Sequence, residues 1–164
     1  MSEPLHTIGV FVANKPGVLL RVTIIFARRG FNIESLVVSS ALDGRFSRMT
    51  ITAKGDAQTL EQIVKHLNKL VDVVHATDTI SSDAVTHELG LVKVLVKPAK
   101  RAEFLQILDH FEAKTLDVTD DVMVIQLSGS STEVDSFVDM ISKFKVLELV
   151  RSGKMVMLKG ETST

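Results

Sequence analysis

The order in which strand and helix patterns follow one another constrains the fold of this chain most strongly. Residues 7–12 place Ile8, Val10 and Val12 on one face of an extended segment, and residues 18–26 repeat apolar side chains at helical spacing. The predicted order of elements in the first half is thus β-α-β-β-α-β. Its expected elements are a strand over 7–12, a helix over 18–29, strands over 32–41 and 48–53 around a two-residue turn at 43–44, a helix over 57–70 capped by Asp56, and a strand over 71–76.

The second half repeats this order of elements without clearly repeating the sequence. A stretch of small and polar residues at 77–83 predicts the linker. We therefore predict an α+β protein of two tandem ferredoxin-like βαββαβ domains, over residues 1–80 and 81–164. The expected elements of this half are strands over 88–96, 115–118, 122–127 and 146–150, and helices with the apolar faces Phe104, Leu105, Leu108, Phe111 and Val134, Phe137, Val138, Ile141, Phe144.

Composition argues against several classes of function. The 164 residues include 19 Lys and Arg against 20 Asp and Glu, so no excess of positive charge draws the chain to nucleic acid or to an acidic membrane. The absence of cysteine rules out thiolate metal sites and thiol nucleophiles, and the absence of Trp and Tyr disfavours a base-stacking platform. With neither a signal-peptide pattern nor a membrane-length apolar run, we expect a cytoplasmic protein that binds neither nucleic acid nor membrane.

The turn between the first strand and the first helix is the strongest candidate for a binding site. Asn14, Pro16 and Gly17 stand directly before the expected helix. A helix start concentrates unpaired N–H groups and about half a positive charge, which suits a small anion. Gly17 lets a ligand approach the backbone, and Pro16 stiffens the entry to the helix. Taken alone, the same pattern also fits an ordinary strand-to-helix turn.

A free amino acid matches the groups near this turn. The amides of Gly17 and Val18 could bind its carboxylate, and Asn14 and Asn32 could hold the carboxylate or the ammonium group. In a ferredoxin-like unit the end of the first strand and the start of the second lie at opposite edges. One small ligand is therefore expected to reach both asparagines across a dimer interface. Such a symmetric dimer also suits the open sheet face and edges, and a ligand that holds it together offers a route to regulation.

No catalytic set is evident elsewhere in the sequence. The five histidines lie in separate elements without the spacing of a known metal motif, so we interpret them as surface or packing residues. No nucleophile elbow or phosphate loop occurs. Asp120-Asp121 is interpreted as a solvated turn and Arg28-Arg29 as a solvated helix end. We therefore predict no catalytic and no metal-binding residues in this chain.

Longer motifs in both halves resemble one protein family. The first half contains Asn-x-Pro-Gly-Val-Leu-x-Arg-Val at 14–22, Phe-x-Arg-Arg-Gly-Phe-Asn-Ile-Glu-Ser-Leu at 26–36 and Leu-x-Lys-Leu-Val-Asp-Val at 67–73. The second half contains Glu-Leu-x-Leu-Val-Lys-Val at 88–94 and Arg-Ser-Gly at 151–153. The first set resembles the ACT domain, an amino-acid-sensing module of biosynthetic enzymes. Over nearly its whole length the chain resembles the small, regulatory subunits of acetolactate synthase, also called acetohydroxyacid synthase.

This resemblance implies a subunit without catalytic activity of its own. It would form a homodimer through its ACT domains, activate a separate catalytic (large) subunit and confer feedback inhibition in branched-chain amino acid biosynthesis, usually by valine. The sequence leaves open whether leucine or isoleucine also binds. The partner would carry thiamine diphosphate, Mg²⁺ and FAD, and this chain none of them. Asn14 and the Gly17-Val18 amides would contact the effector from one chain and Asn32 from the other. The implied effector-binding set is Asn14, Pro16, Gly17, Val18, Leu19, Asn32 and Ile33.

Some positions depart from the family pattern, and two other functions remain open. Ala13, Leu20 and Lys159-Gly160 replace residues that are frequent in the family, which bears on the identity and affinity of the effector. A stand-alone enzyme on a ferredoxin-like scaffold would need a cluster of buried ionisable groups. A pair of RNA-binding units would need an aromatic platform and a basic surface. The sequence displays neither feature.

Overall fold

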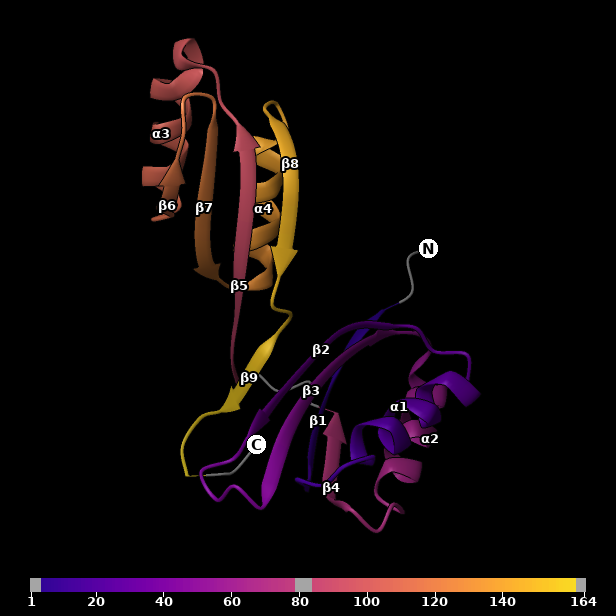
Figure 1. Cartoon of the computed structure of the whole chain (residues 1–164). Helices are drawn as coiled ribbons and strands as arrows, with labels where there is room; N and C mark the ends of the chain where they lie inside the picture. The colour runs from indigo at the N-terminus through magenta and orange to yellow at the C-terminus, as the bar shows by residue number, and fades with distance from the viewer. Residues whose placement is uncertain (1–3, 79–83, 162–164) are drawn as a thin grey trace. The chain divides into compact units, whose positions relative to one another are not determined.

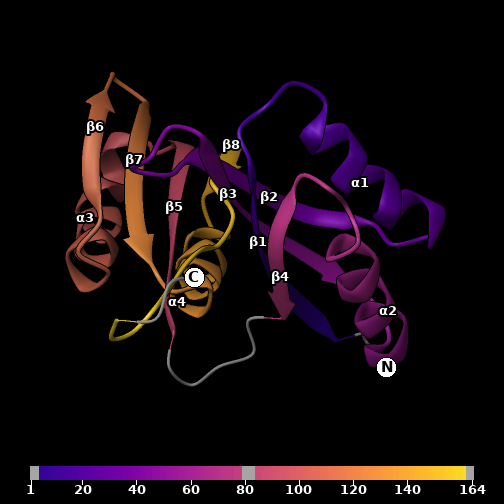
Figure 2. The same ribbon diagram turned by 90° about the horizontal axis from the view of Figure 1, so that it is seen from below.

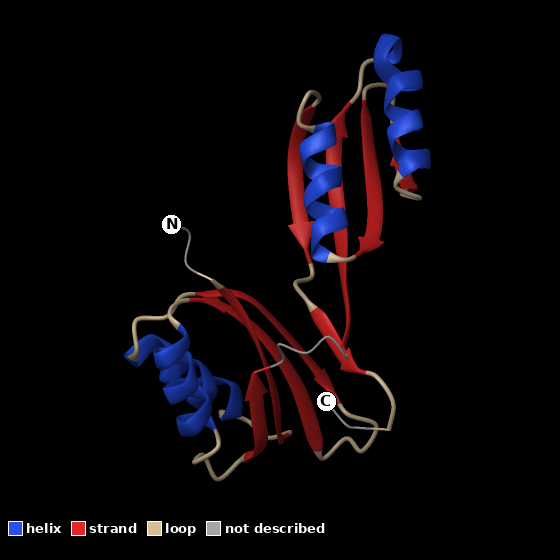
Figure 3. Cartoon of the chain, turned by 180° about the vertical axis from the view of Figure 1, so that it is seen from behind, coloured by secondary structure: helices blue, strands red, loops and turns tan. Residues whose placement is uncertain are grey.

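The chain folds into two compact units, each an antiparallel sheet with two helices on one face (Figures 1 and 3). The structure is a computed structural model that describes residues 4–78 and 84–161. The first unit comprises residues 1–85 together with 153–164, and the second comprises residues 86–152. The C-terminal segment thus groups with the first unit. The expected linker is partly wrong, because Thr77 and Asp78 belong to a strand, and its remainder at 79–83 lies outside the described residues.

The first unit has the predicted ferredoxin-like topology, with strand order β2-β3-β1-β4. Ile8, Val10 and Val12 of the central strand are buried beneath α1 and α2, which lie side by side on one face of the sheet (Figure 2). Asp56 caps α2 as predicted, since its carboxylate accepts a hydrogen bond from Thr59 N at 2.8 Å. The elements are β1 (Leu5–Ala13), α1 (Val18–Arg28), β2 (Ile33–Ser40), β3 (Phe46–Lys54), α2 (Ala57–Leu67) and β4 (Val73–Asp78).

Two loops of the first unit differ from the sequence prediction. The turn between β2 and β3 spans residues 41–45 instead of two residues, because Arg45 folds back on Asp43 and donates to its carboxylate from Nε at 2.8 and 2.9 Å. The strand predicted to begin at Val71 begins at Val73. Val71 therefore stands in a loop, where its side chain is fully exposed.

The second unit repeats the topology, with strand order β6-β7-β5-β8 and β9 pairing with β5. Phe104, Leu108 and Phe137 are buried beneath the sheet, whereas Leu105 is exposed, so the predicted apolar face of α3 is wrong at that residue. Its place is taken by Ile107, which follows Phe104 at helical spacing. The elements of this half are β5 (Ala84–Leu95), a 3₁₀ turn η1 (Pro98–Lys100), α3 (Arg101–His110), β6 (Lys114–Val118), β7 (Val122–Gly129), α4 (Ser131–Ile141) and β8 (Lys145–Arg151). The last strand, β9 (Met155–Leu158), lies in the C-terminal segment that groups with the first unit.

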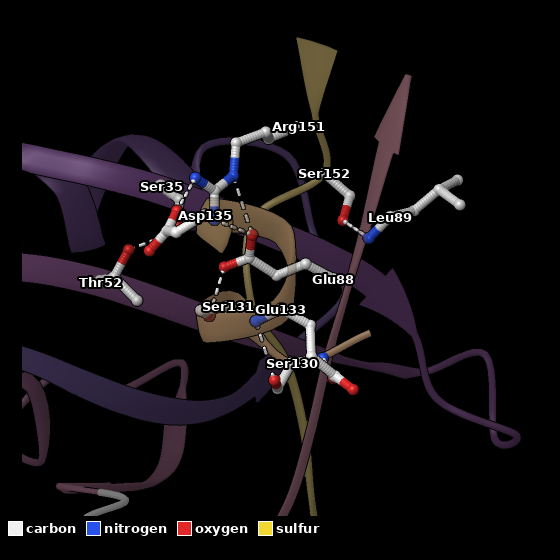
Figure 4. Close-up of polar contacts among 10 residues, drawn as sticks. All are labelled: Ser35, Thr52, Glu88, Leu89, Ser130, Ser131, Glu133, Asp135, Arg151 and Ser152. Atoms are coloured by element: carbon white, nitrogen blue, oxygen red, sulfur yellow. Dashed lines mark hydrogen bonds and ion pairs between the residues drawn. The ribbon is translucent and has the colours of Figure 1, made fainter. Parts of the chain in front are cut away.

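A buried ion pair joins β5 and β8 where the chain enters and leaves the second unit (Figure 4). Glu88 is only 4% exposed and accepts hydrogen bonds from Arg151 Nε at 2.9 Å and Nη2 at 2.5 Å. Ser131 Oγ donates to the other carboxylate oxygen at 2.6 Å, and Asp135 pairs with Arg151 at 2.5 Å. Because a buried charge is costly unless it is paired and hydrogen-bonded, this set of contacts makes Glu88 tolerable in the core.

Candidate functional site

The start of α1 lacks the groups that normally satisfy a helix N-terminus. Its N-cap is Gly17, no side chain caps the helix, and its first turn contains no acidic residue. Among the α-helices of the described chain, only α1 lacks both a capping side chain and an acidic residue in its first turn. Helices α2 and α4 are capped by Asp56 and Ser130, and α3 has Glu103 in its first turn. The N–H of Val18 donates to the carbonyl of Lys15 at 3.4 Å, and the other N–H groups at the start of α1 are available to an anion from outside the helix.

Gly17 is required by the geometry of this turn. Its φ is +81°, in the left-handed region that residues with a side chain adopt at a cost. A Cβ at this position would lie 3.2 Å from Nη1 of Arg21. Arg21 thus adds a positive charge beside the helix start, and its Nη2 is held at 2.6 Å from the carboxylate of Asp72. In the sequence Arg21 is only one residue of the motif over 14–22, which does not predict a charge beside the helix start. Because Arg21 stands one helical turn after Gly17, its spacing could have indicated a positive charge beside the helix start.

Asn14 lies at the end of β1 and is joined to the loop over residues 41–45. Its backbone N–H donates to the carbonyl of Arg45 at 2.7 Å, and its side-chain Nδ2 donates to the carbonyl of Gly44 at 2.9 Å. The side chain is otherwise exposed, and the structure gives it no second partner within the described residues. Its Oδ1 and remaining amide hydrogen can therefore bind a ligand near Gly17.

The other predicted residues divide between core and surface. Val18 is 2% exposed and its backbone N–H donates to the carbonyl of Lys15 at 3.4 Å, so a ligand would have to replace that long bond, whereas Leu19 is 41% exposed. Asn32 and Ile33 follow the end of α1 and line a groove of about 430 Å³ along the outer side of that helix. Leu20 also lines the groove. This half of the candidate site is therefore largely apolar, with Asn32 as a polar group at its end.

One chain does not bring the two halves of the site together. Asn14 and Gly17 precede α1, and Asn32 follows it. The helix has eleven residues and is therefore about 16 Å long. A free amino acid is only about one residue wide and cannot span this distance. The two ends of α1 therefore form two separate halves within a single chain.

Other candidate chemistry is limited. The described residues contain no group of three or more His, Asp or Glu side chains arranged to hold a metal ion. His6 is buried in the first unit, with Nε2 at 3.1 Å from the carbonyl of Gly55, which agrees with a packing role. Burial raises the pKa of Asp78, and the neighbouring His6 partly offsets this. Within residues 4–78 and 84–161, no helix has the length and apolar character needed to cross a membrane.

Comparison with known proteins identifies the family. A model described as "AHAS small subunit-like ACT domain" matches residues 8–75, and one described as "Small subunit of acetolactate synthase" matches residues 87–160. A probable acetolactate synthase small subunit of Archaeoglobus fulgidus is 42% identical over 94% of this chain and 97% of its own length. The chain belongs to the acetolactate synthase small-subunit family. An acetolactate synthase small subunit of Mycolicibacterium smegmatis is 35% identical over 97% of this chain and 94% of its own length.

The fold of the small-subunit family agrees with the structure described above. The crystal structure of the acetolactate synthase small subunit from Thermotoga maritima superposes with a TM-score of 0.85 at 34% identity, covering 97% of this chain and 99% of that one. The predicted pair of βαββαβ units and the predicted ACT domain are therefore confirmed. Because the match covers nearly the full length of both chains, the agreement in fold extends to both units.

Proposed function

We propose that this chain is the regulatory subunit of an acetolactate synthase, acting in the cytoplasm in branched-chain amino acid biosynthesis. It binds the catalytic subunit, raises its activity and confers feedback inhibition by valine, with leucine or isoleucine as further effectors. The catalytic subunit carries the thiamine diphosphate, Mg²⁺ and FAD, and this chain catalyses no reaction alone. The family membership and the small-subunit names of the curated relatives support the assignment.

The effector binds between two copies of the ACT domain. The observation that carries this proposal is the separation of Asn14 and Gly17 from Asn32 by the whole length of α1, about 16 Å. The amides at the start of α1, the Arg21 charge and Asn14 suit the carboxylate of valine. Asn32 of the partner subunit suits its ammonium group, and the apolar groove of that subunit suits its side chain.

A two-fold dimer with antiparallel α1 helices brings these halves together. In that arrangement the start of α1 in one copy meets the end of α1 in the other. Leu20 and Ile24 are one helical turn apart and are 63% and 36% exposed, so they can pack between the two helices. Strand β2 forms an edge of the first sheet and can pair with its own copy. A ligand that binds only the dimer stabilises it, and this links effector concentration to assembly.

The test uses complementation between two site variants. The chain is titrated into the catalytic subunit with and without valine while acetolactate formation is measured. We expect activation and valine sensitivity from the unsubstituted chain. Asn14→Ala and Asn32→Ala are each expected to lose valine sensitivity while retaining part of the activation.

Co-expression of the two variants then decides whether the site is shared. In a mixed dimer one site loses both asparagines and the other retains both, so each mixed dimer has one intact site. Random pairing makes about half of the dimers mixed, so about a quarter of all sites are intact, and that fraction of the valine binding should return. A site contained within one chain would remain defective in every dimer, and absence of recovery would contradict the shared site. No activation by the unsubstituted chain would contradict the regulatory function itself.

A further inference from the structure

Two fully exposed apolar side chains stand on loops at one end of the first unit. Leu42 lies in the loop over residues 41–45, and Val71 lies in the loop over residues 68–72, between α2 and β4. Both loops are found at the lower end of the first unit in Figure 1, beyond the end of β1. Nothing in the described chain covers either side chain. Both apolar tips are thus accessible to a partner that approaches this end of the unit.

Both loops are hydrogen-bonded to the segment that leads into the candidate effector site. The backbone N–H of Ala13 donates to the carbonyl of Asp72 at 2.8 Å. Asn14 donates to the carbonyls of Arg45 and Gly44 at 2.7 and 2.9 Å. Residues 13–14 therefore bridge the two loops, and any shift of Asn14 on ligand binding acts on both.

The charges beside the two apolar tips are already paired. Asp43 accepts hydrogen bonds from Nε of Arg45 at 2.8 and 2.9 Å, and Asp72 pairs with Arg21 at 2.6 Å. Both aspartates thus retain a cation when a partner covers the loops, which lowers the cost of removing water from them. The same contacts restrain the loops and so reduce the entropy lost on binding.

We infer that the loops over residues 41–45 and 68–72, here called the two-loop surface, contact the catalytic subunit, with Leu42 and Val71 entering apolar depressions on it. The inference rests on the proposed function and adds the place of contact to it. A second copy of this chain is the less suitable occupant, because the proposed dimer contact uses the outer side of α1 and the edge of β2. The catalytic subunit also suits the bonding pattern, since effector occupancy must be conveyed to that partner and Asn14 is joined directly to the two-loop surface.

The experiment compares Leu42→Ser, Val71→Ser and the double variant with Leu5→Ser. Leu5 is 45% exposed at the opposite end of β1, so its substitution controls for the loss of an exposed apolar side chain. Each full-length chain is titrated into the catalytic subunit while acetolactate formation is followed. Valine binding by the isolated chain is measured by calorimetry, and its dimerisation by sedimentation.

Each loop variant should raise the concentration for half-maximal activation about tenfold, and the double variant about a hundredfold, as expected for losing a buried apolar contact. Leu5→Ser, valine binding and dimerisation should be unchanged. A double variant that activates within twofold of the unsubstituted chain would overturn the inference while leaving the proposed function intact. So would a loss of dimerisation in the loop variants, which would assign the two-loop surface to a second copy. If the unsubstituted chain fails to activate the catalytic subunit, the proposed function is contradicted, and the inferred contact of the two-loop surface falls as well.

Discussion

Replacing Gly17 by aspartate tests the proposed effector site most directly. The substitution introduces a carboxylate at the start of α1, where the effector carboxylate is proposed to bind. Gly17 has a φ of +81°, and an added Cβ would lie 3.2 Å from Nη1 of Arg21. The variant therefore combines a local backbone cost with a charge placed at the ligand position, and the two effects can be separated.

The charge is the larger effect on binding. Two like charges about 4 Å apart repel by about 4 kcal/mol at the effective dielectric constant of a protein surface. Since 1.4 kcal/mol corresponds to a factor of ten, the Kd for valine should rise about a thousandfold. Arg21 neutralises part of this charge, so a hundredfold increase is the smallest that agrees with the proposal. The left-handed φ separately lowers the free energy of unfolding by about 1–2 kcal/mol.

Two matched variants separate backbone strain from charge. Gly17→Ala introduces the same strain and the same contact with Arg21 without a charge, and should weaken valine binding far less. Gly160→Asp introduces the charge at another glycine with positive φ, +76°, where a Cβ would meet no heavy atom within 4 Å. It should lose stability in urea unfolding to a similar degree and keep its affinity for valine.

Calorimetric titration of each isolated chain with valine, together with inhibition of acetolactate formation, provides the measurement. If Gly17→Asp raises the Kd for valine less than a hundredfold, the carboxylate does not lie at the start of α1. If Gly17→Ala and Gly17→Asp lose the same affinity, strain and not charge is responsible. Either result refutes the reasoning from the helix start.

Two further predictions concern stability. Arg151→Met leaves Glu88 as an unpaired buried carboxylate and should lower the free energy of unfolding by about 3–5 kcal/mol in urea titrations; a loss below 1 kcal/mol would show that water reaches Glu88. Hydrogen bonds from the side chain and backbone of Thr59 lower the pKa of Asp56 below its ordinary value of 3.8. The stabilisation of the folded chain by ionised Asp56 is therefore complete above pH 3.8 and is lost as the pH falls through the lowered pKa of the folded state. Thermal unfolding between pH 6 and pH 2.5 should therefore show a smaller loss of stability at acid pH for Asp56→Ala than for the unsubstituted chain; identical pH profiles would contradict this.

The fold was predictable because its signals are local. The alternation of Ile8, Val10 and Val12 and the helical spacing that continues to Phe26 each indicate one buried face, and the structure buries all four residues. The errors arose where a contact from elsewhere decides the backbone. Asp43-Gly44 suggests a two-residue turn, but the hydrogen bond from the side chain of Asn14 to the carbonyl of Gly44, 30 residues away, holds a wider loop.

The candidate site was predictable only as a set of residue types around one turn. A motif could point to Asn14, Gly17 and Asn32, and the topology could place them at opposite ends of one helix. The sequence could not reveal the positive charge beside Gly17, because Arg21 is held there by Asp72, which is 51 residues away in the sequence. Nor could it show that Val71 is exposed, since a β-branched residue before Val73 favours a strand.

The contacts of Asn14 connect the proposed effector site to the proposed surface for the catalytic subunit. Its side-chain Nδ2 donates to Gly44 at 2.9 Å, and its backbone is held by Arg45. A ligand that draws this side chain toward Gly17 competes with the bond to Gly44 and so alters the loop that presents Leu42. By linkage, a partner that fixes the same loop must alter the affinity of Asn14 for the ligand by the same free energy. Feedback inhibition and activation would then be two consequences of one asparagine shared between a ligand site and a contact loop.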